Sequence, residues 1–87
     1  MKHTTSGFGY ELADAVKDDF ELVEIIADYS KGNKLVAPEL MRRLLGQEQF
    51  DRLKEHCRKE DGIVSTRRML EETTEILNGE QNPELKN

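Results

Sequence analysis

Residues Asp18–Ser30 read DDFELVEIIADYS and predict a helix whose apolar surface is unusually wide. Asp18, followed three residues later by Glu21, is typical of a helix start at which both side chains satisfy free backbone N–H groups. At a helical period the apolar residues fall on two sides, Phe20, Val23 and Ala27 on one and Leu22, Ile25, Ile26 and Tyr29 on the other. This apolar arc covers roughly 220°, against about 100° for a one-sided surface helix. The rest of the chain, or a second chain, must therefore cover it.

The length and composition indicate one small domain. The chain has 87 residues, of which 36% are hydrophobic and 36% charged, so its core is small, and such cores often gain stability by self-association. The single cysteine, Cys57, excludes an intramolecular disulfide and favours a reducing compartment. No apolar run reaches membrane-spanning length, and residues 1–10, MKHTTSGFGY, lack a signal-peptide core. We therefore expect a soluble intracellular protein.

Charge is distributed unevenly along the chain. The net charge of −5 argues against non-specific binding to nucleic acid. Residues 1–41 carry −4, residues 42–68 carry +3 and residues 69–87 carry −4. This layout favours head-to-tail contact between copies, in which the basic segment, with Arg42 and Arg43, meets an acidic segment of a neighbour. The alternative is a set of solvated helix faces whose imbalance has no function.

The two ends of the chain differ from its middle. A period-two pattern favours a short strand in a flexible N-terminal arm, residues 1–17, that needs a hairpin partner or another subunit's edge; its apolar residues are Phe8, Tyr10 and Leu12. Residues 80–87 contain Pro83 and almost no apolar side chains, which predicts a disordered tail. The helical domain is therefore predicted to span residues 18–79.

Three further helices are predicted after the first. Pro38 begins one that ends at Gly46, since glycine suits a left-handed C-terminal conformation. Another spans about 47–59, and the last follows the Asp61–Gly62 turn and ends at Asn78–Gly79. The predicted fold class is all-α, a small bundle of about four short helices with an extended N-terminal arm and a disordered C-terminal tail.

The residues that often carry chemistry do not form a catalytic or metal-binding pattern. His56 and Cys57 are adjacent, so on a helix they point about 100° apart and cannot pair as base and nucleophile. Together with His3 they make no recognisable metal spacing. Cys57 lies on an apolar stripe, which is typical of a buried structural thiol. We expect no catalytic residue, no metal, no cofactor and no enzymatic activity.

A helix-turn-helix is suggested by two predicted helices that meet at Gly46 with basic residues nearby. Against this, the second of them begins Gln47–Glu48–Gln49 and carries Asp51 and Glu55, whose charges repel phosphates.

The two apolar sides of the first helix are assigned different roles. We assign contact with a partner or another subunit to Leu22, Ile25, Ile26 and Tyr29. The core is predicted to contain Phe20, Val23, Leu44, Phe50, Leu53, Met69, Leu70, Ile76 and Leu77. Excess apolar surface on a soluble protein usually marks a contact site. The alternative is that the chain covers this surface itself, with Phe8, Tyr10 and the Ile63–Val64 turn.

Three segments, taken in order, resemble a known family. They are DDFELVE at Asp18–Glu24, LLGQEQFDRLKEH at Leu44–His56 and EDGIVSTRRM at Glu60–Met69, followed by a closing amphipathic helix. In order and spacing they resemble the small tail assembly chaperones of long-tailed bacteriophages, which are encoded just upstream of the tape measure protein. The resemblance runs from about Gly7 to Leu77.

The resemblance implies a non-enzymatic chaperone that binds and solubilises the tape measure protein before tail tube subunits polymerise around it. It also implies self-association into a ring or spiral, with the tail tube protein as a further candidate partner and no nucleic acid or membrane. The expected location is the host cytoplasm, not the mature virion. The alternatives are a small helix-turn-helix-like DNA-binding regulator and a structural head–tail or tail component retained in the virion.

Overall fold

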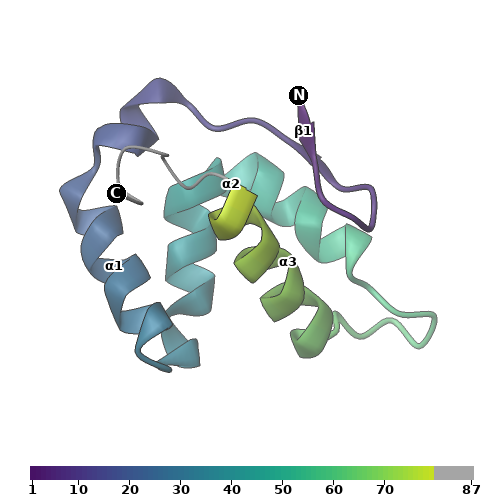
Figure 1. Ribbon diagram of the computed structural model, residues 1–87. Coiled ribbons are helices and arrows are strands. Elements are labelled where there is room, and N and C mark those ends of the chain that lie inside the picture. The colour runs from purple at the N-terminus through teal and green to yellow at the C-terminus, as the bar shows by residue number, and fades with distance from the viewer. Residues whose placement is uncertain (80–87) are drawn as a thin grey trace.

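Helices make up most of the computed structural model, which describes residues 1–79. Within this range the α-helices are α1 (Phe20–Ser30), α2 (Ala37–His56) and α3 (Thr66–Gly79). The short 3-10 helices η1 (Asp14–Asp18) and η2 (Lys34–Val36) precede α1 and α2, and Figure 1 shows α1 and α3 on either side of α2. The predicted helical class is confirmed at this coarse level. The predicted disordered tail, residues 80–87, lies outside the described residues.

The predicted second and third helices form one kinked element, α2. Gly46 interrupts its helical geometry with a φ of 80° and a ψ of 159°. The positive φ is the property that suits glycine to a helix end, but this ψ is extended instead of left-handed helical. The chain therefore turns at Gly46 and re-enters a helix at once, so that the two halves of α2 point in different directions (Figure 1). Four separate helices are not confirmed among residues 1–79.

The start of α1 lies one residue beyond its predicted cap. Asp19, not Asp18, is the N-cap, and its carboxylate accepts a hydrogen bond from the Leu22 backbone N–H at 3.2 Å. Asp18 instead ends η1. Glu21 lies in the first turn, where a negative charge interacts favourably with the helix dipole.

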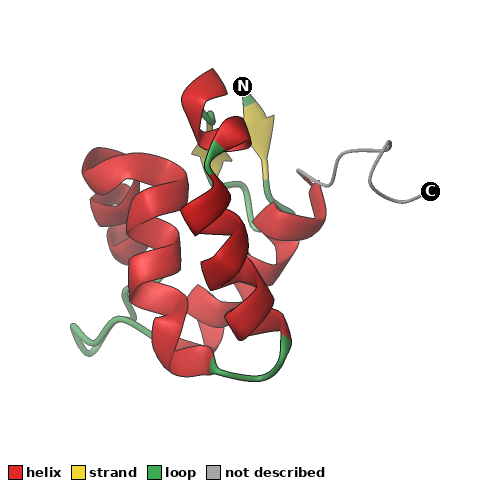
Figure 2. Cartoon of the chain, turned by 90° about the vertical axis from the view of Figure 1, so that its left-hand side faces the viewer, coloured by secondary structure: helices red, strands yellow, loops and turns green. Residues whose placement is uncertain are grey.

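The N-terminal arm supplies both the predicted strand and its partner. β1 (Lys2–His3) pairs antiparallel with β2 (Gly9–Tyr10), and Figure 2 shows this hairpin at one end of the helices. Phe8 and Tyr10 are each only 3% exposed, and their rings stack at a centroid distance of 6.4 Å. The strand therefore has its hairpin partner within its own chain.

The core lies where α1 and α3 pack against α2. Its fully buried side chains are Leu40, Met41, Leu53, Cys57, Thr73 and Ile76. Of the predicted core residues, Leu44, Phe50, Leu53 and Ile76 are buried, and Met69, Leu70 and Leu77 are half-buried against them. The prediction is wrong for Phe20 and Val23, which are 74% and 54% exposed.

Replacing Gly46 with Ala is expected to lower the free energy of unfolding by about 1–3 kcal/mol, because an L side chain strains this backbone conformation. Adjacent residues aside, nothing lies within 4 Å of the position that the new Cβ would occupy, so the loss comes from the backbone alone. Urea denaturation followed by circular dichroism measures it. Glu48→Ala, at an exposed helical position, is the control, and equal stability of Gly46→Ala and the native chain would contradict the observed φ.

Candidate functional site

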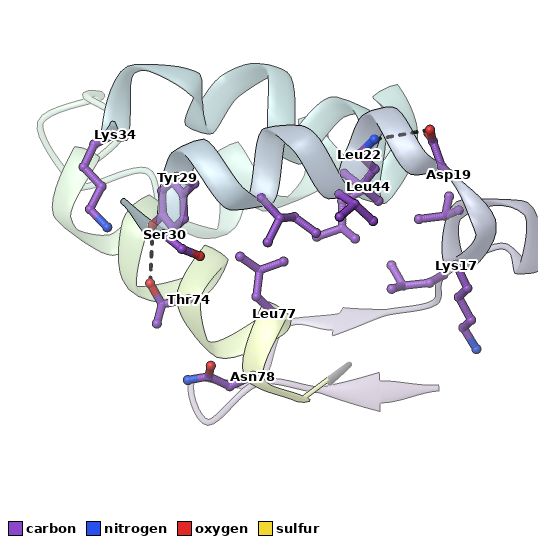
Figure 3. Close-up of a pocket in the computed structure, with 14 residues that line it drawn as sticks. Lys17, Asp19, Leu22, Tyr29, Ser30, Lys34, Leu44, Thr74, Leu77 and Asn78 are labelled. Atoms are coloured by element: carbon purple, nitrogen blue, oxygen red, sulfur yellow. Dashed lines mark hydrogen bonds between the residues drawn. The ribbon is translucent and has the colours of Figure 1, made fainter. Parts of the chain in front are cut away.

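An apolar groove of about 560 Å³ runs between η1, α1 and the C-terminal end of α3 (Figure 3). We call it the α1–α3 groove. Its apolar lining includes Leu12, Val16, Val23, Ile26, Leu44 and Leu77. Figure 3 shows Lys17 and Lys34 at its opposite ends, so a mostly apolar trough lies between two positive charges.

Tyr29 fixes the end of the groove that lies near Lys34. The Tyr29 hydroxyl reaches α3, where it lies 3.3 Å from Thr74 Oγ1 (Figure 3). It also lies 3.4 Å from the Leu70 carbonyl oxygen. The Lys34 ammonium lies 4.0 Å from the centroid of the Tyr29 ring, within the range of a cation–π contact. Tyr29 therefore ties the C-terminal end of α1 to α3.

The structure reverses part of the predicted division of α1. Leu22 and Tyr29, assigned to partner contact, are 4% and 3% exposed and belong to the chain's own core. Ile25 and Ile26 are half-buried against that core, and Ile26 also lines the groove. Helical period separates the two sides of α1 but does not say which of them meets α2. The buried side carries four large side chains and the other side includes an alanine, so this orientation removes more apolar area from water.

The solvent-facing side of α1 is an apolar surface next to the groove. It consists of Phe20, Val23 and Ala27, which we call the α1 stripe. All three residues are exposed, and Val23 also lines the groove, so the stripe and the groove share an edge. This exposed surface, together with the half-buried Ile26 in the groove, is the part of α1 available to another molecule.

Arg43, predicted to contact a partner, is engaged within the chain. Its guanidinium donates to Asp19 at 2.6 Å and to Glu21 at 2.9 Å, and so joins α2 to the start of α1. The hydrogen bond from Arg43 lowers the pKa of Asp19 below its ordinary value. Arg42 places its guanidinium 5.2 Å from the centroid of the Phe50 ring.

The basic segment 42–68 is similarly neutralised at several points. Ion pairs within the chain involve Arg43, Lys54, Arg58, Lys59 and Arg67. Solvent screens exposed pairs of this kind, so they contribute little to stability. Of these pairs, only those of Arg43 with Asp19 and of Arg67 with Glu71 reach acidic residues outside the segment and so reduce the charge that it offers to a neighbour; head-to-tail attraction between copies stays a prediction.

A polar cluster joins the N-terminal hairpin to α3. Glu72 is buried, and its carboxylate accepts hydrogen bonds from Thr4 Oγ1 at 2.7 Å and from Ser6 Oγ at 2.9 Å. Thr5 donates to Glu75, also on α3, through its hydroxyl at 2.5 Å. The sequence offered no signal for this cluster, because its members lie more than sixty positions apart.

His56 lies beside this cluster, but the geometry does not make a nucleophile and base. The Ser6 Oγ is 2.9 Å from His56 Nε2. The Ser6 hydroxyl donates its hydrogen bond to the Glu72 carboxylate. His56 Nε2 can therefore only donate to Ser6 Oγ, and it is not placed to accept the Ser6 proton as a base. Within residues 1–79, no group of three or more His, Cys, Asp or Glu side chains is placed to hold a metal ion.

None of the helices in the same range is long and apolar enough to cross a membrane.

Cys57 is 1% exposed at the end of α2. Burial, with a smaller contribution from the Glu72 charge, raises the pKa of the Cys57 thiol from its ordinary value of 9.0 to about 11. The thiolate is the reactive form, so this environment suits a packing role.

Comparison with known proteins gives no relative: no family model, no curated protein and no solved structure matches the chain.

Replacing Glu72 with Ala is expected to lower the free energy of unfolding by about 1–3 kcal/mol, since it leaves the buried Thr4 hydroxyl without its carboxylate acceptor. Hydrogen exchange of residues 1–10 should become faster, because the hairpin loses its link to α3. Glu71→Ala is the matched control, for Glu71 is exposed and pairs only on the surface with Arg67. Equal losses in the two variants would show that the Glu72 cluster is not a structural link.

Cys57 should react slowly with thiol reagents at pH 8 in the folded state and rapidly in urea. Since its folded pKa lies above the unfolded value, its contribution to stability is present below about pH 9 and is lost as the pH rises to about 11. The free energy of unfolding should therefore fall more steeply between pH 9 and pH 11 in the native chain than in Cys57→Ala. Parallel curves for the two proteins would exclude this cause.

Proposed function

We propose that this protein is a tail assembly chaperone of a long-tailed bacteriophage, which binds and solubilises the tape measure protein during tail morphogenesis. The observation that supports the proposal is the α1–α3 groove, with the exposed α1 stripe at its edge. Apolar surface of this kind on a small polar chain is typical of a contact site. The resemblance of the three sequence segments supports the same function independently of the groove.

An amphipathic helix is the occupant that the groove favours. Helices that bind in grooves insert apolar side chains spaced at i, i+3, i+4 and i+7 along one face. The groove offers apolar contacts from three elements, with Val16 on η1, Ile26 on α1 and Leu77 on α3. A tape measure protein is a long helical chain, so it presents many such faces in succession.

The proposed activity requires reversible covering of the client and no catalytic step. An extended amphipathic helix aggregates unless its apolar face is covered. Many copies bound along one client, as a ring or spiral, give avidity while each contact stays weak enough to be displaced. In this proposal the growing tail tube displaces the chaperone in the host cytoplasm, and the mature particle does not retain it.

Co-expression with the tape measure protein that the proposal expects to be encoded just downstream of this chain tests the proposal. We expect the partner to become soluble and to co-purify with several copies of the chain. Val16→Asp places a charge in the groove and should weaken binding by about tenfold, the effect of losing ~1.4 kcal/mol. Asn78→Trp fills the groove from an exposed position and should act similarly without altering the core. Ile63→Asp, at an apolar position that is 61% exposed and outside the groove, is the matched control.

A partner that stays insoluble and does not co-purify would overturn the proposal, as would binding that both groove variants leave unchanged. Recovery of the chain from purified virions would indicate a structural tail component instead. A mobility shift of DNA at physiological salt would indicate a DNA-binding regulator.

A further inference from the structure

We propose that two copies of this chain pair through α1, with the two α1 helices antiparallel and their α1 stripes in contact. The pairing involves no client, so it does not rest on the proposed function. It goes beyond self-association in general because it specifies the surface, the direction and the register.

The sizes of the exposed side chains favour this register. Phe20, Val23, Ala27 and Ser30 follow one another at intervals of three and four residues, the spacing of a seam between two helices. In an antiparallel pair centred on residue 25, Val23 of one copy lies opposite Ala27 of the other, and Phe20 lies opposite Ser30. Each large side chain then meets a small one, which lets the two helices approach closely.

Charge selects the antiparallel direction. Residues 18–24 contain four acidic and no basic side chains, whereas residues 28–34 contain one acidic and two basic side chains. A parallel pair would place the two acidic segments side by side. An antiparallel pair instead places each acidic segment beside the basic segment of the other copy, with Asp18 near Lys31, and it also opposes the two helix dipoles favourably. Arg43 pairs with Asp19 and Glu21 in its own copy. It therefore reduces the negative charge of residues 18–24 but does not reverse its sign.

The size of α1 sets the expected affinity. An 11-residue helix is about 16 Å long, so the contact is much smaller than the roughly 1,600 Å² of a standard interface. We therefore expect a dissociation constant between about 1 μM and 1 mM. Glu24 lies at the edge of the seam close to the two-fold axis in both copies, where the like charges repel. Glu24→Gln should accordingly tighten the pair.

Sedimentation equilibrium up to roughly 1 mM protein measures the pairing. Phe20→Asp should raise the dissociation constant by about tenfold or more and keep the helical circular dichroism signal, because Phe20 is 74% exposed. Ile63→Asp should leave the constant unchanged. A native chain that stays monomeric over this range would overturn the proposal, and so would a Phe20→Asp variant that pairs as well as the native chain.

Cysteine oxidation tests the direction and the register. A mixture of Val23→Cys and Ala27→Cys should form a covalent dimer, since a disulfide requires Cα atoms within about 7 Å. Each variant alone should form little, because its own two cysteines are offset by about 6 Å along the helix axis in addition to the separation across the seam, which places their Cα atoms beyond that limit. Native Cys57 is buried and does not compete. Equal cross-linking in all three samples would overturn the antiparallel register.

Experiments can refute the pairing through α1 and the proposed chaperone function independently of each other. Val16→Asp changes a residue of η1 and should weaken client binding about tenfold without affecting pairing. If Phe20→Asp abolishes pairing while the client stays soluble, the pairing is independent of the chaperone function, as proposed here. If client binding is absent and the native chain still pairs, only the proposed function is lost.

Discussion

The turn of the chain at Gly46 is the constraint on which the rest of the structure depends. A straight 20-residue helix would be about 30 Å long, whereas the kink gives the two halves of α2 different directions and different neighbours. With the kink, the first half of α2 carries Leu44 to the floor of the groove beside α1. The second half reaches the hairpin, where the rings of Phe8 and His56 lie 5.5 Å apart. One element therefore organises both parts of a small core.

The hairpin is held by apolar burial and positioned by polar contacts. Burying Phe8 and Tyr10 contributes on the order of 1.5–3 kcal/mol for each ring, whereas a hydrogen bond within the protein contributes about 0.5–1.5 kcal/mol net. The rings therefore supply most of the attraction. The hydrogen bonds to Glu72 fix the orientation of the hairpin on α3, because a buried carboxylate is strongly unfavourable in any arrangement that leaves it unpaired.

The sequence predicted those features that depend on local chemistry. Apolar period located the helices, aspartate capping located the start of α1 to within one residue, and glycine at position 46 correctly marked a positive φ. The sequence also predicted a helix on either side of Gly46, but it could not predict the direction in which the second half of α2 leaves the turn, since that depends on what both halves contact. The orientation of α1 was predicted wrongly because both of its sides are apolar; the larger side chains on the Leu22 side were the signal in the sequence that favours burial of that side. The Glu72 cluster depends on tertiary placement alone.

The exposure of Phe20 is best explained by a contact outside the described chain. Phe8 and Phe50 are 3% and 5% exposed, so this fold buries phenylalanine where it can. The two segments that could have covered α1 do not do so: the hairpin lies against the second half of α2, and Ile63 of the turn is itself 61% exposed. Burial of Phe20 would stabilise the protein by about 1.5–3 kcal/mol, a large share of the stability of a domain this small. Since residues 1–79 leave that stabilisation unused, a second molecule that covers the α1 stripe would gain it.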